Sequence, residues 1–285
     1  MRFFHTLWTA PMKPANVAAN IVAFTASAAL IKNFGGKIVL HTDYLGADML
    51  SHIPYDEIIV DLNELPVDIC NKFWAYGKLY ATSKESLGSV HIDGDVFLKQ
   101  PALMNLFNDD YDLLVQSRED ENWRKNACYE NTQWVYSHYD LPNNMSAVWP
   151  MAYNCGIVKI NNRTLKKKYL DTYFKTVDII TEDAKLDDYI SEANARETGN
   201  VILDIVAEQQ FLTQIAEEGN YDTKFILNGD IFESAVKLGY THLCANSKYE
   251  LYDDMKIMLQ KIDMHLYNKM CDNDIFKTYE LKIDY

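Results

Sequence analysis

Short β-branched runs alternate with helical segments through the first hundred residues, and this alternation restricts the folds open to the chain. Strand–helix–strand order of this kind predicts an α/β fold with a mostly parallel central sheet flanked by helices. In such a sheet, ligands bind beyond the carboxyl ends of the strands. We expect strands at Phe3–Trp8, Lys37–Thr42, Glu57–Asp61 and Ser89–Ile92, and helices at Pro14–Asn33 and Asp68–Ser83.

The most apolar stretch of the sequence lies in the first expected helix. Its apolar residues recur at steps of three and four from Val17 to Ile31, and Gly35-Gly36 follows the helix as a stop signal. The stretch is alanine-rich, contains Asn20, and is shorter than the roughly 20 residues that a membrane span needs. We therefore expect a buried helix, no membrane span and no secretory signal.

Charge and cysteine usage exclude several classes of protein. The chain has 41 acidic against 27 basic residues and a net charge of -14, which disfavours nucleic acids and anionic lipids as partners. Its five cysteines lie far apart without a CxxC pair. They indicate neither a disulfide framework nor a zinc site, and they suit a reducing, cytoplasmic location.

The segment Asp93-Gly94-Asp95 follows the strand expected at Ser89–Ile92. In an extended backbone, side chains two apart point the same way, so both carboxylates can face one ligand. We expect Gly94 to let a bulky group approach the backbone. Two carboxylates suit a hard cation such as Mn²⁺ or Mg²⁺, which keeps water or substrate phosphate in its shell.

Two other interpretations of this segment stay open. An Asp-Gly pair between Val90–Ile92 and Val96–Leu98 is also a strong signal for a β-hairpin. The pattern Asp-x-Asp-x-Val also resembles the motif of haloacid-dehalogenase-type phosphohydrolases, in which Asp93 would attack phosphate and Asp95 would act as acid and base. That family places its motif on the first strand, whereas three strand-like runs precede it here.

A second resemblance covers nearly the whole chain. The segment His91–Leu98 resembles the DxD segment of GT-A glycosyltransferases, and Tyr153–Val158 is similar to their Asn-x-Gly-Val strand. Glu208-Gln209 resembles an acidic-Gln pair on a later helix of that family. His242, followed by Lys248, resembles the late histidine and lysine of its glycogenin-like and bacterial surface-glycan members.

The resemblance implies a metal and diphosphate site. Asp95 and His242 would coordinate the metal, and Asp93 would contact the metal or the ribose. Lys248 would contact the diphosphate, and Lys78 would contact donor phosphate. The chain departs from the family pattern after the histidine, because Ala245 replaces a glycine and Tyr249-Glu250 replaces Pro-Trp.

The same resemblance implies roles for further residues. Trp8 and Thr9 would touch the nucleobase and ribose, and Asn154 and Glu208 would border the acceptor wall as catalytic residues. Gly156 and Gln209 would bind substrate.

Each of these residues also has a purely structural interpretation. His242 can be a hydrogen-bonded residue near a strand end, and Lys78 can be a solvated lysine. The segment Asn154-Cys155-Gly156 can be a bulge with a buried thiol. Glu208 and Gln209 can lie on a solvated helix face.

The resulting hypothesis is one GT-A-like domain over residues 1–285. Residues 1–100 would form the nucleotide-binding half, residues 101–247 the acceptor half and residues 248–285 a C-terminal helical segment. The resemblance implies metal-dependent transfer of a sugar from a nucleotide sugar, expected to be UDP-linked, to a glycan or lipid-linked acceptor.

The resemblance favours retention of anomeric configuration, while an inverting reaction would use a carboxylate base at Glu119, Asp204 or Glu208. A non-catalytic module that binds nucleotide sugars is the further alternative.

Overall fold

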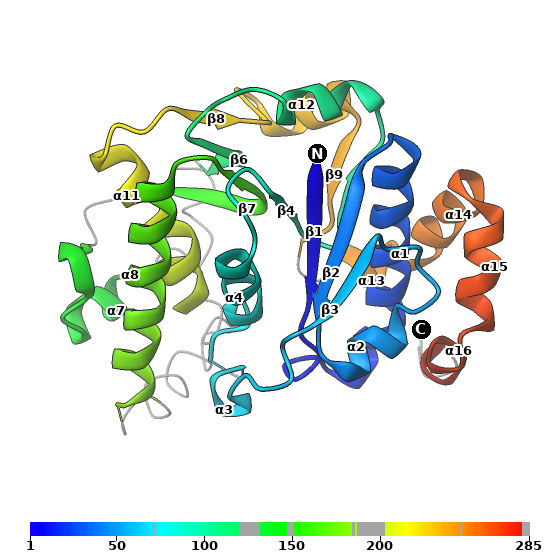
Figure 1. Ribbon diagram of the computed structural model, residues 1–285, viewed down its shortest axis with the longest axis horizontal. Coiled ribbons are helices and arrows are strands. Elements are labelled where there is room, and N and C mark those ends of the chain that lie inside the picture. Colours follow the sequence, from blue (N-terminus) through cyan, green and yellow to red (C-terminus); the bar gives the residue numbers. More distant parts are fainter. Residues whose placement is uncertain are drawn as a thin grey trace. The chain divides into compact units, whose positions relative to one another are not determined.

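The computed structural model describes residues 1–70, 72–119, 132–146, 151–183, 186, 203–244 and 247–280 (Figure 1). The chain divides into two compact units, each assembled from separate stretches of sequence. The first unit contains Met1–Leu65, Ser89–Asp109 and Gly229–Tyr285, and the second contains Pro66–Gly88 and Asp110–Asn228.

Parallel strands in the order β3-β2-β1-β4 form the sheet of the first unit. Phe3 of the β1 strand pairs with Ile38 on one side and with Val90 on the other. The aliphatic and aromatic residues of β1, β2 and β4 are buried, as expected for parallel strands covered on both faces, whereas Ile58 and Val60 of the edge strand β3 are each 38% exposed. The strands are β1 (Arg2–Leu7), β2 (Lys37–Thr42), β3 (Glu57–Val60) and β4 (Val90–Ile92).

Helix α1 (Val17–Asn33) is the core helix of this unit, and its residues from Val17 to Ile31 are buried except for Asn20. The segment Pro14–Asn33 is long and apolar enough to cross a membrane on those criteria alone, but 78% of its most apolar stretch is buried inside the protein. The helix packs against C-terminal helices. These are α13 (Ser247–Glu250), α14 (Tyr252–Ile262), α15 (Met264–Asp272) and α16 (Asp274–Glu280).

A separate antiparallel ladder joins β5 (Val96–Leu98) to β9 (Tyr240–His242). Helix α12 (Ile231–Leu238) leads into β9 through Gly239, which has a φ of 65° and ends the helix in the left-handed conformation. The remaining helices of the first unit are η1 (Pro14–Asn16), α2 (Tyr44–Met49) and η2 (Pro101–Phe107).

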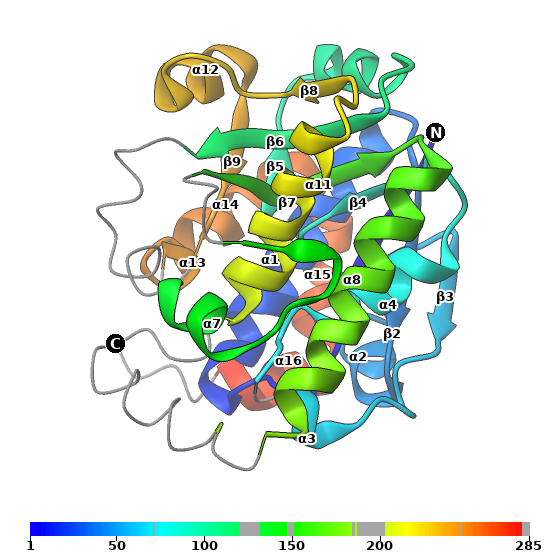
Figure 2. The same cartoon turned by 90° about the vertical axis from the view of Figure 1, so that its left-hand side faces the viewer.

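The second unit has β6 (Leu113–Glu119) between an antiparallel partner, β7 (Ala152–Ile160), and a parallel partner, β8 (Thr223–Phe225). Its described helices are α3 (Val67–Cys70), α4 (Tyr76–Lys84), α7 (Gln133–His138), η3 (Pro142–Asn144), α8 (Arg163–Thr181), the π-helix η4 (Ile205–Gln210) and α11 (Phe211–Glu218). Of these, α8, η4 and α11 pack on β7 (Figure 2). Tyr173 and Phe211 lie in the core of the unit.

These elements confirm the predicted α/β class with a mostly parallel sheet flanked by helices. The predicted continuous helix Asp68–Ser83 is wrong, because α3 and α4 are separate. The backbone N–H groups of Trp74 and Ala75 donate to the carboxylate of Asp204, at 2.9 and 3.3 Å, instead of continuing a helix. The prediction of one domain with three consecutive parts stays a prediction.

Candidate functional site

Asp93-Gly94-Asp95 forms the connection between β4 and β5. The N–H of Val96 donates to the carbonyl of Asp93 at 3.0 Å, and the N–H of Leu243 donates to the carbonyl of Asp95 at 3.0 Å. Val96 lies opposite His242 in the β5–β9 ladder. The β-hairpin interpretation is therefore wrong, since the strands on either side of the turn pair with β1 and β9 in different sheets.

Three potential metal ligands converge at this turn. The Nε2 atom of His242 lies 3.5 Å from Oδ1 of Asp95 and 3.9 Å from Oδ2 of Asp93. One ligand atom from each residue lies within 4.8 Å of the others, and all three side chains are partly exposed. Ligands about 2.1 Å from an octahedral ion stand roughly 3 to 4 Å apart, so this donor set fits a hard divalent cation.

Lys248 completes this cluster from helix α13. Its Nζ atom lies 2.7 Å from Oδ2 of Asp95 and 3.3 Å from Oδ1 of Asn20. On the other side, Nδ1 of His91 lies 3.8 Å from Oδ1 of Asp93. The structure thus brings together Asp93, Asp95, His242 and Lys248, which the sequence placed in one site.

The electrostatics of the cluster follow from its burial and its charges. Burial alone would raise the pKa of Asp95, but its hydrogen bond with His242 and the charge of Lys248 bring that pKa well below its ordinary value. Burial would lower the pKa of His242, and the interaction with Asp95 instead raises it well above 6.5. The pKa of Lys248 is likewise raised by Asp95 against the effect of burial. The first unit therefore holds a concentrated acidic centre balanced by cationic neighbours.

Gly94 lets a bulky group approach the backbone, as expected, and that group is a side chain of the protein. A Cβ atom at this position would lie 2.3 to 2.5 Å from ring carbons of Phe24, so the glycine makes room for a side chain of α1. The sequence pattern did not identify which group this would be.

Trp8 and Thr9 follow β1 in the first unit. Trp8 is buried, and Thr9 donates from its backbone N–H and its hydroxyl to Oδ2 of Asp43, at 2.7 and 2.8 Å. Asp43 also accepts the N–H of Gly46 and caps α2. Sequence reasoning did not single out Asp43, although an aspartate between a strand and a helix is a recognisable capping signal.

A buried ion pair occupies two predicted site residues of the second unit. Nζ of Lys78 lies 2.7 Å from Oε1 of Glu208 and donates to the carbonyl of Cys155 at 2.7 Å. Lys78 is 8% exposed and Glu208 is 1% exposed. The solvated interpretations of both residues are therefore wrong. Nearby, burial raises the pKa of Asp204 well above its usual value, and the charge of Glu208 adds to the shift.

The Asn-x-Gly segment forms an irregular stretch of β7. The register of β6 against β7 shifts between Val115 and Ser117, opposite the region of Asn154. Asn154 donates to Oε1 of Glu119 at 2.7 Å and accepts the N–H of Gly156 at 3.0 Å. Cys155 is buried. The register shift and the buried thiol agree with the bulge interpretation of this segment.

The predicted site residues fall into two groups. Asp93, Asp95, His242, Lys248, Trp8 and Thr9 belong to the first unit, and Lys78, Asn154, Gly156, Glu208 and Gln209 belong to the second. Gln209 is half-buried. The catalytic and binding roles of both groups stay predictions.

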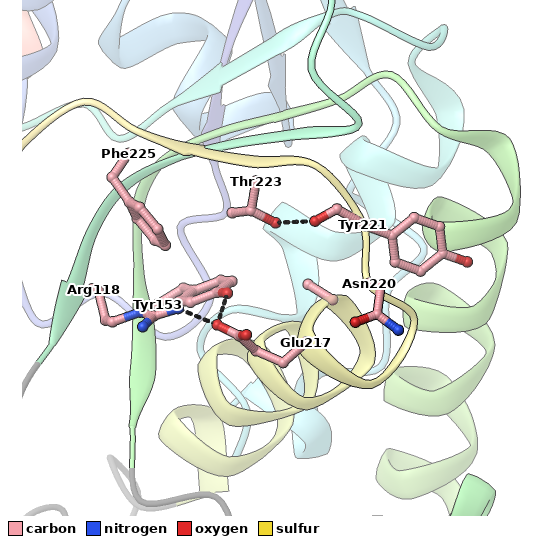
Figure 3. Close-up of a pocket in the computed structure, with 8 residues that line it drawn as sticks. Arg118, Tyr153, Glu217, Asn220, Tyr221, Thr223 and Phe225 are labelled. Atoms are coloured by element: carbon pink, nitrogen blue, oxygen red, sulfur yellow. Dashed lines mark hydrogen bonds and ion pairs between the residues drawn. The ribbon is translucent and has the colours of Figure 1, made fainter.

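A pocket of about 310 Å³ lies in the second unit between the end of α11 and strand β8 (Figure 3). Arg118 forms an ion pair with Glu217, and the hydroxyl of Tyr153 donates to the same carboxylate at 2.5 Å. The guanidinium lies 5.3 Å from the ring centre of Phe225. Because the charges of Arg118 and Glu217 neutralise each other, we assign this pocket no ligand.

The class defined by these observations is an α/β protein with an Asp-Asp-His cluster at the carboxyl end of a parallel strand. The model of a family of unknown function, DUF6734, matches residues 1–273, so the chain belongs to that family. No curated protein matches the chain at a significant level.

Several solved structures of glycosyltransferases are similar to the chain. For a complex of the galactosyltransferase LgtC with donor and acceptor sugar analogues, identity is 10%, the TM-score is 0.44, and the match covers 92% of this chain and 96% of that one. For mouse xyloside xylosyltransferase 1, identity is 12%, the TM-score is 0.38, and the match covers 79% of this chain and 84% of that one. For the glycosyltransferase GlyE of Streptococcus pneumoniae, identity is 12%, the TM-score is 0.33, and the match covers 100% of this chain and 65% of that one. These TM-scores are below 0.5, so the similarities carry no argument about the chemistry of the site.

Proposed function

We propose that this protein is a metal-dependent glycosyltransferase of the GT-A type. It would transfer a sugar from a nucleotide sugar, with UDP as the expected nucleotide, to a glycan or lipid-linked acceptor. The observation that carries the proposal is the convergence of Asp93, Asp95 and His242, with the ammonium of Lys248 beside them. The proposal does not depend on the similar solved structures.

The donor set favours Mn²⁺ over Mg²⁺. Two carboxylates suit both ions, whereas an imidazole ligand such as His242 is uncommon for Mg²⁺. Asp93, Asp95 and His242 would hold the ion, and His242 would have to lose its proton to act as a ligand. When bound, the ion supplies positive charge that stabilises the departing nucleoside diphosphate.

Lys248 is placed to bind the same leaving group. Its ammonium, which faces Asp95 in this structure, is a compact positive charge suited to phosphate oxygens. If the ammonium of Lys248 left Asp95 and bound the diphosphate, it would orient the donor and balance its negative charge. In the second unit, Asn154 and Gln209, which are partly exposed, would bind the acceptor, whereas Glu208 is buried against Lys78 and would support them from behind.

Retention of anomeric configuration is part of the proposal. An inverting reaction needs an ionised carboxylate base that an acceptor can reach. Of the candidate bases, Asp204 is fully buried with a raised pKa, Glu208 is paired with Lys78, and Glu119 accepts a hydrogen bond from Asn154. These contacts favour a reaction without a carboxylate base.

A cytoplasmic location also belongs to the proposal. Cys155, Cys244 and Cys271 are free thiols in the described part of the chain, which suits a reducing compartment.

Thermal unfolding with nucleoside diphosphates, with and without Mn²⁺, tests the metal and diphosphate site. At about 100 times the dissociation constant, a ligand adds about 2.7 kcal/mol to the stability of the folded state. For a chain of this size we expect UDP with Mn²⁺ to raise Tm by about 4 °C or more, and either component alone to raise it less. Asp95→Asn should abolish the combined shift, whereas Asp274→Asn, at an exposed carboxylate of the same unit, should preserve it.

Activity assays separate the remaining alternatives. A transferase should hydrolyse one UDP-sugar slowly without acceptor, and Asp95→Asn should stop this. Phosphate release from phosphomonoesters that survives Asp95→Asn but not Asp93→Asn, with no UDP binding, would identify a phosphohydrolase instead. Metal-dependent UDP binding without hydrolysis or transfer of any tested sugar would identify a binding module.

A further inference from the structure

We propose that Phe24 is a positioning residue of the metal site, because its ring fixes the turn that carries Asp93 and Asp95. The inference rests on the proposed metal-binding function and adds a residue from helix α1 that touches no substrate.

The contact between Phe24 and Gly94 leaves no room for a side chain on the turn. A Cβ atom at Gly94 would lie 2.3, 2.4 and 2.5 Å from Cε2, Cδ2 and Cζ of Phe24. The φ of Gly94 is outside the left-handed region, so the backbone conformation itself is open to any residue. The close approach of the Phe24 ring therefore requires glycine at this position, whereas the backbone conformation does not.

Phe24 is itself held in place by buried polar groups. Its ring meets the imidazole of His5 edge to face, with ring centres 5.1 Å apart and planes at 81°. The two ring nitrogens of His5 lie 2.9 Å from the hydroxyl of Tyr55 and 3.1 Å from Oγ of Ser27. Phe24 is 7% exposed. A ring packed in this way resists displacement, so a clash moves the turn instead.

The size of the clash indicates that a side chain at residue 94 affects metal binding more than folding. To reach ordinary contact, a Cβ at Gly94 would have to move from 2.3 Å to at least 3.4 Å from the ring. Metal–ligand distances tolerate only about 0.2 Å. The turn connects the two carboxylates directly, so a movement of this size disrupts the ligand set while the core of the unit can stay folded.

Mn²⁺ titrations of four forms of the full chain test the inference: wild type, Gly94→Ala, Phe24→Leu and the double variant. We expect Gly94→Ala to weaken Mn²⁺ binding about tenfold or more, as loss of an outer-shell contact does. Phe24→Leu should weaken it about threefold, because the turn loses its support. The double variant should bind within about threefold of wild type, since leucine lacks Cε2 and Cζ and its δ methyl groups can rotate away from residue 94.

Gly219→Ala is the matched control in the second unit. Its Cβ would lie 2.2 Å from Cε2 of Tyr221, a comparable clash with an aromatic ring. We expect this variant to lower Tm and to keep the Mn²⁺ affinity of wild type. A purely structural role for Phe24 would make the two glycine variants behave alike in both measurements.

The outcomes distinguish this inference from the proposed function. If wild type binds Mn²⁺ and Asp95→Asn does not, while Gly94→Ala binds as well as wild type, Phe24 has no positioning role and the metal site stands. Should Gly94→Ala fail to fold, a folded Phe24→Leu variant with unchanged affinity overturns the inference, and one with weakened affinity supports it. If wild type does not bind Mn²⁺, both proposals are wrong.

Discussion

Replacing Lys248 with methionine should have opposite effects on the metal and on the diphosphate. The ammonium lies 2.7 Å from Oδ2 of Asp95, and the two side chains are 17% and 14% exposed. In the free protein it competes with a cation for this carboxylate and repels a bound dication. With a nucleotide present, the same ammonium would bind phosphate oxygens. Lys248→Met should therefore tighten the binding of Mn²⁺ alone and weaken the binding of UDP in the presence of Mn²⁺.

The geometry sets the size of both effects. Two unit charges about 4 Å apart interact by about 4 kcal/mol at an effective dielectric constant of roughly 20. Mn²⁺ binding must overcome this attraction between Lys248 and Asp95, but the two groups regain solvation when they separate. If solvation offsets two thirds of the attraction, about 1.4 kcal/mol remains, which corresponds to about tenfold in Mn²⁺ affinity. A hydrogen bond to a charged group contributes about 1.5 to 3 kcal/mol. UDP binding should then weaken by about ten- to a hundredfold.

Isothermal titration calorimetry of the wild type and the variant, with Mn²⁺ first and then UDP, measures both quantities. Lys256→Met is the control, because Lys256 forms an ion pair with Glu280 at 2.5 Å elsewhere in the same unit. Its Mn²⁺ and UDP affinities should match those of wild type. The reasoning fails if Lys248→Met leaves Mn²⁺ affinity unchanged or lowers it, or if UDP binding does not weaken.

Two further predictions concern stability. Lys78→Met removes the ammonium that lies 2.7 Å from Oε1 of Glu208, a residue that is 1% exposed. Because removing one charge of a buried ion pair is strongly destabilising, we expect the free energy of unfolding measured in urea to fall by about 3 to 5 kcal/mol. Lys78→Met combined with Glu208→Gln should cost less, and a loss below about 1 kcal/mol for the single variant would contradict this prediction. Burial lowers the pKa of His5 to about 3 from 6.5, so the unfolded chain binds more protons below pH 6.5. The free energy of unfolding should then fall by roughly 1.4 kcal/mol per pH unit from this residue as pH drops from 6.5 towards 3, and a His5→Gln variant with an equally steep loss would refute the assignment.

The strands of the first unit could be predicted because their signal is local. β1, β2 and β4 are short runs of β-branched and aromatic residues bounded by turn residues, and α1 is a long run of apolar and small residues with Gly35 beyond its end. The break between α3 and α4 could not be predicted. It depends on Asp204, 130 residues after Trp74, whose carboxylate takes backbone donors that a continuous helix would have used.

The side chains of the candidate site were predicted in part. The order of motifs pointed to Asp93, Asp95, His242 and Lys248, and the structure brings them together. One of the two interpretations of Glu208 placed it on a solvated helix face, but the residue is 1% exposed. It lies in a π-helix, Ile205–Gln210, where the wider turn changes which side chains face the core.

The ladder between β5 and β9 joins residues 96–98 to residues 240–242, and this pairing has a consequence for biosynthesis. A ribosome would release both aspartates well before it made the histidine that faces them. Pairings so distant along the sequence form late and slowly. A growing polypeptide would therefore carry an incomplete set of ligands at the proposed cation site until residues 240–242 had been made and had docked on β5.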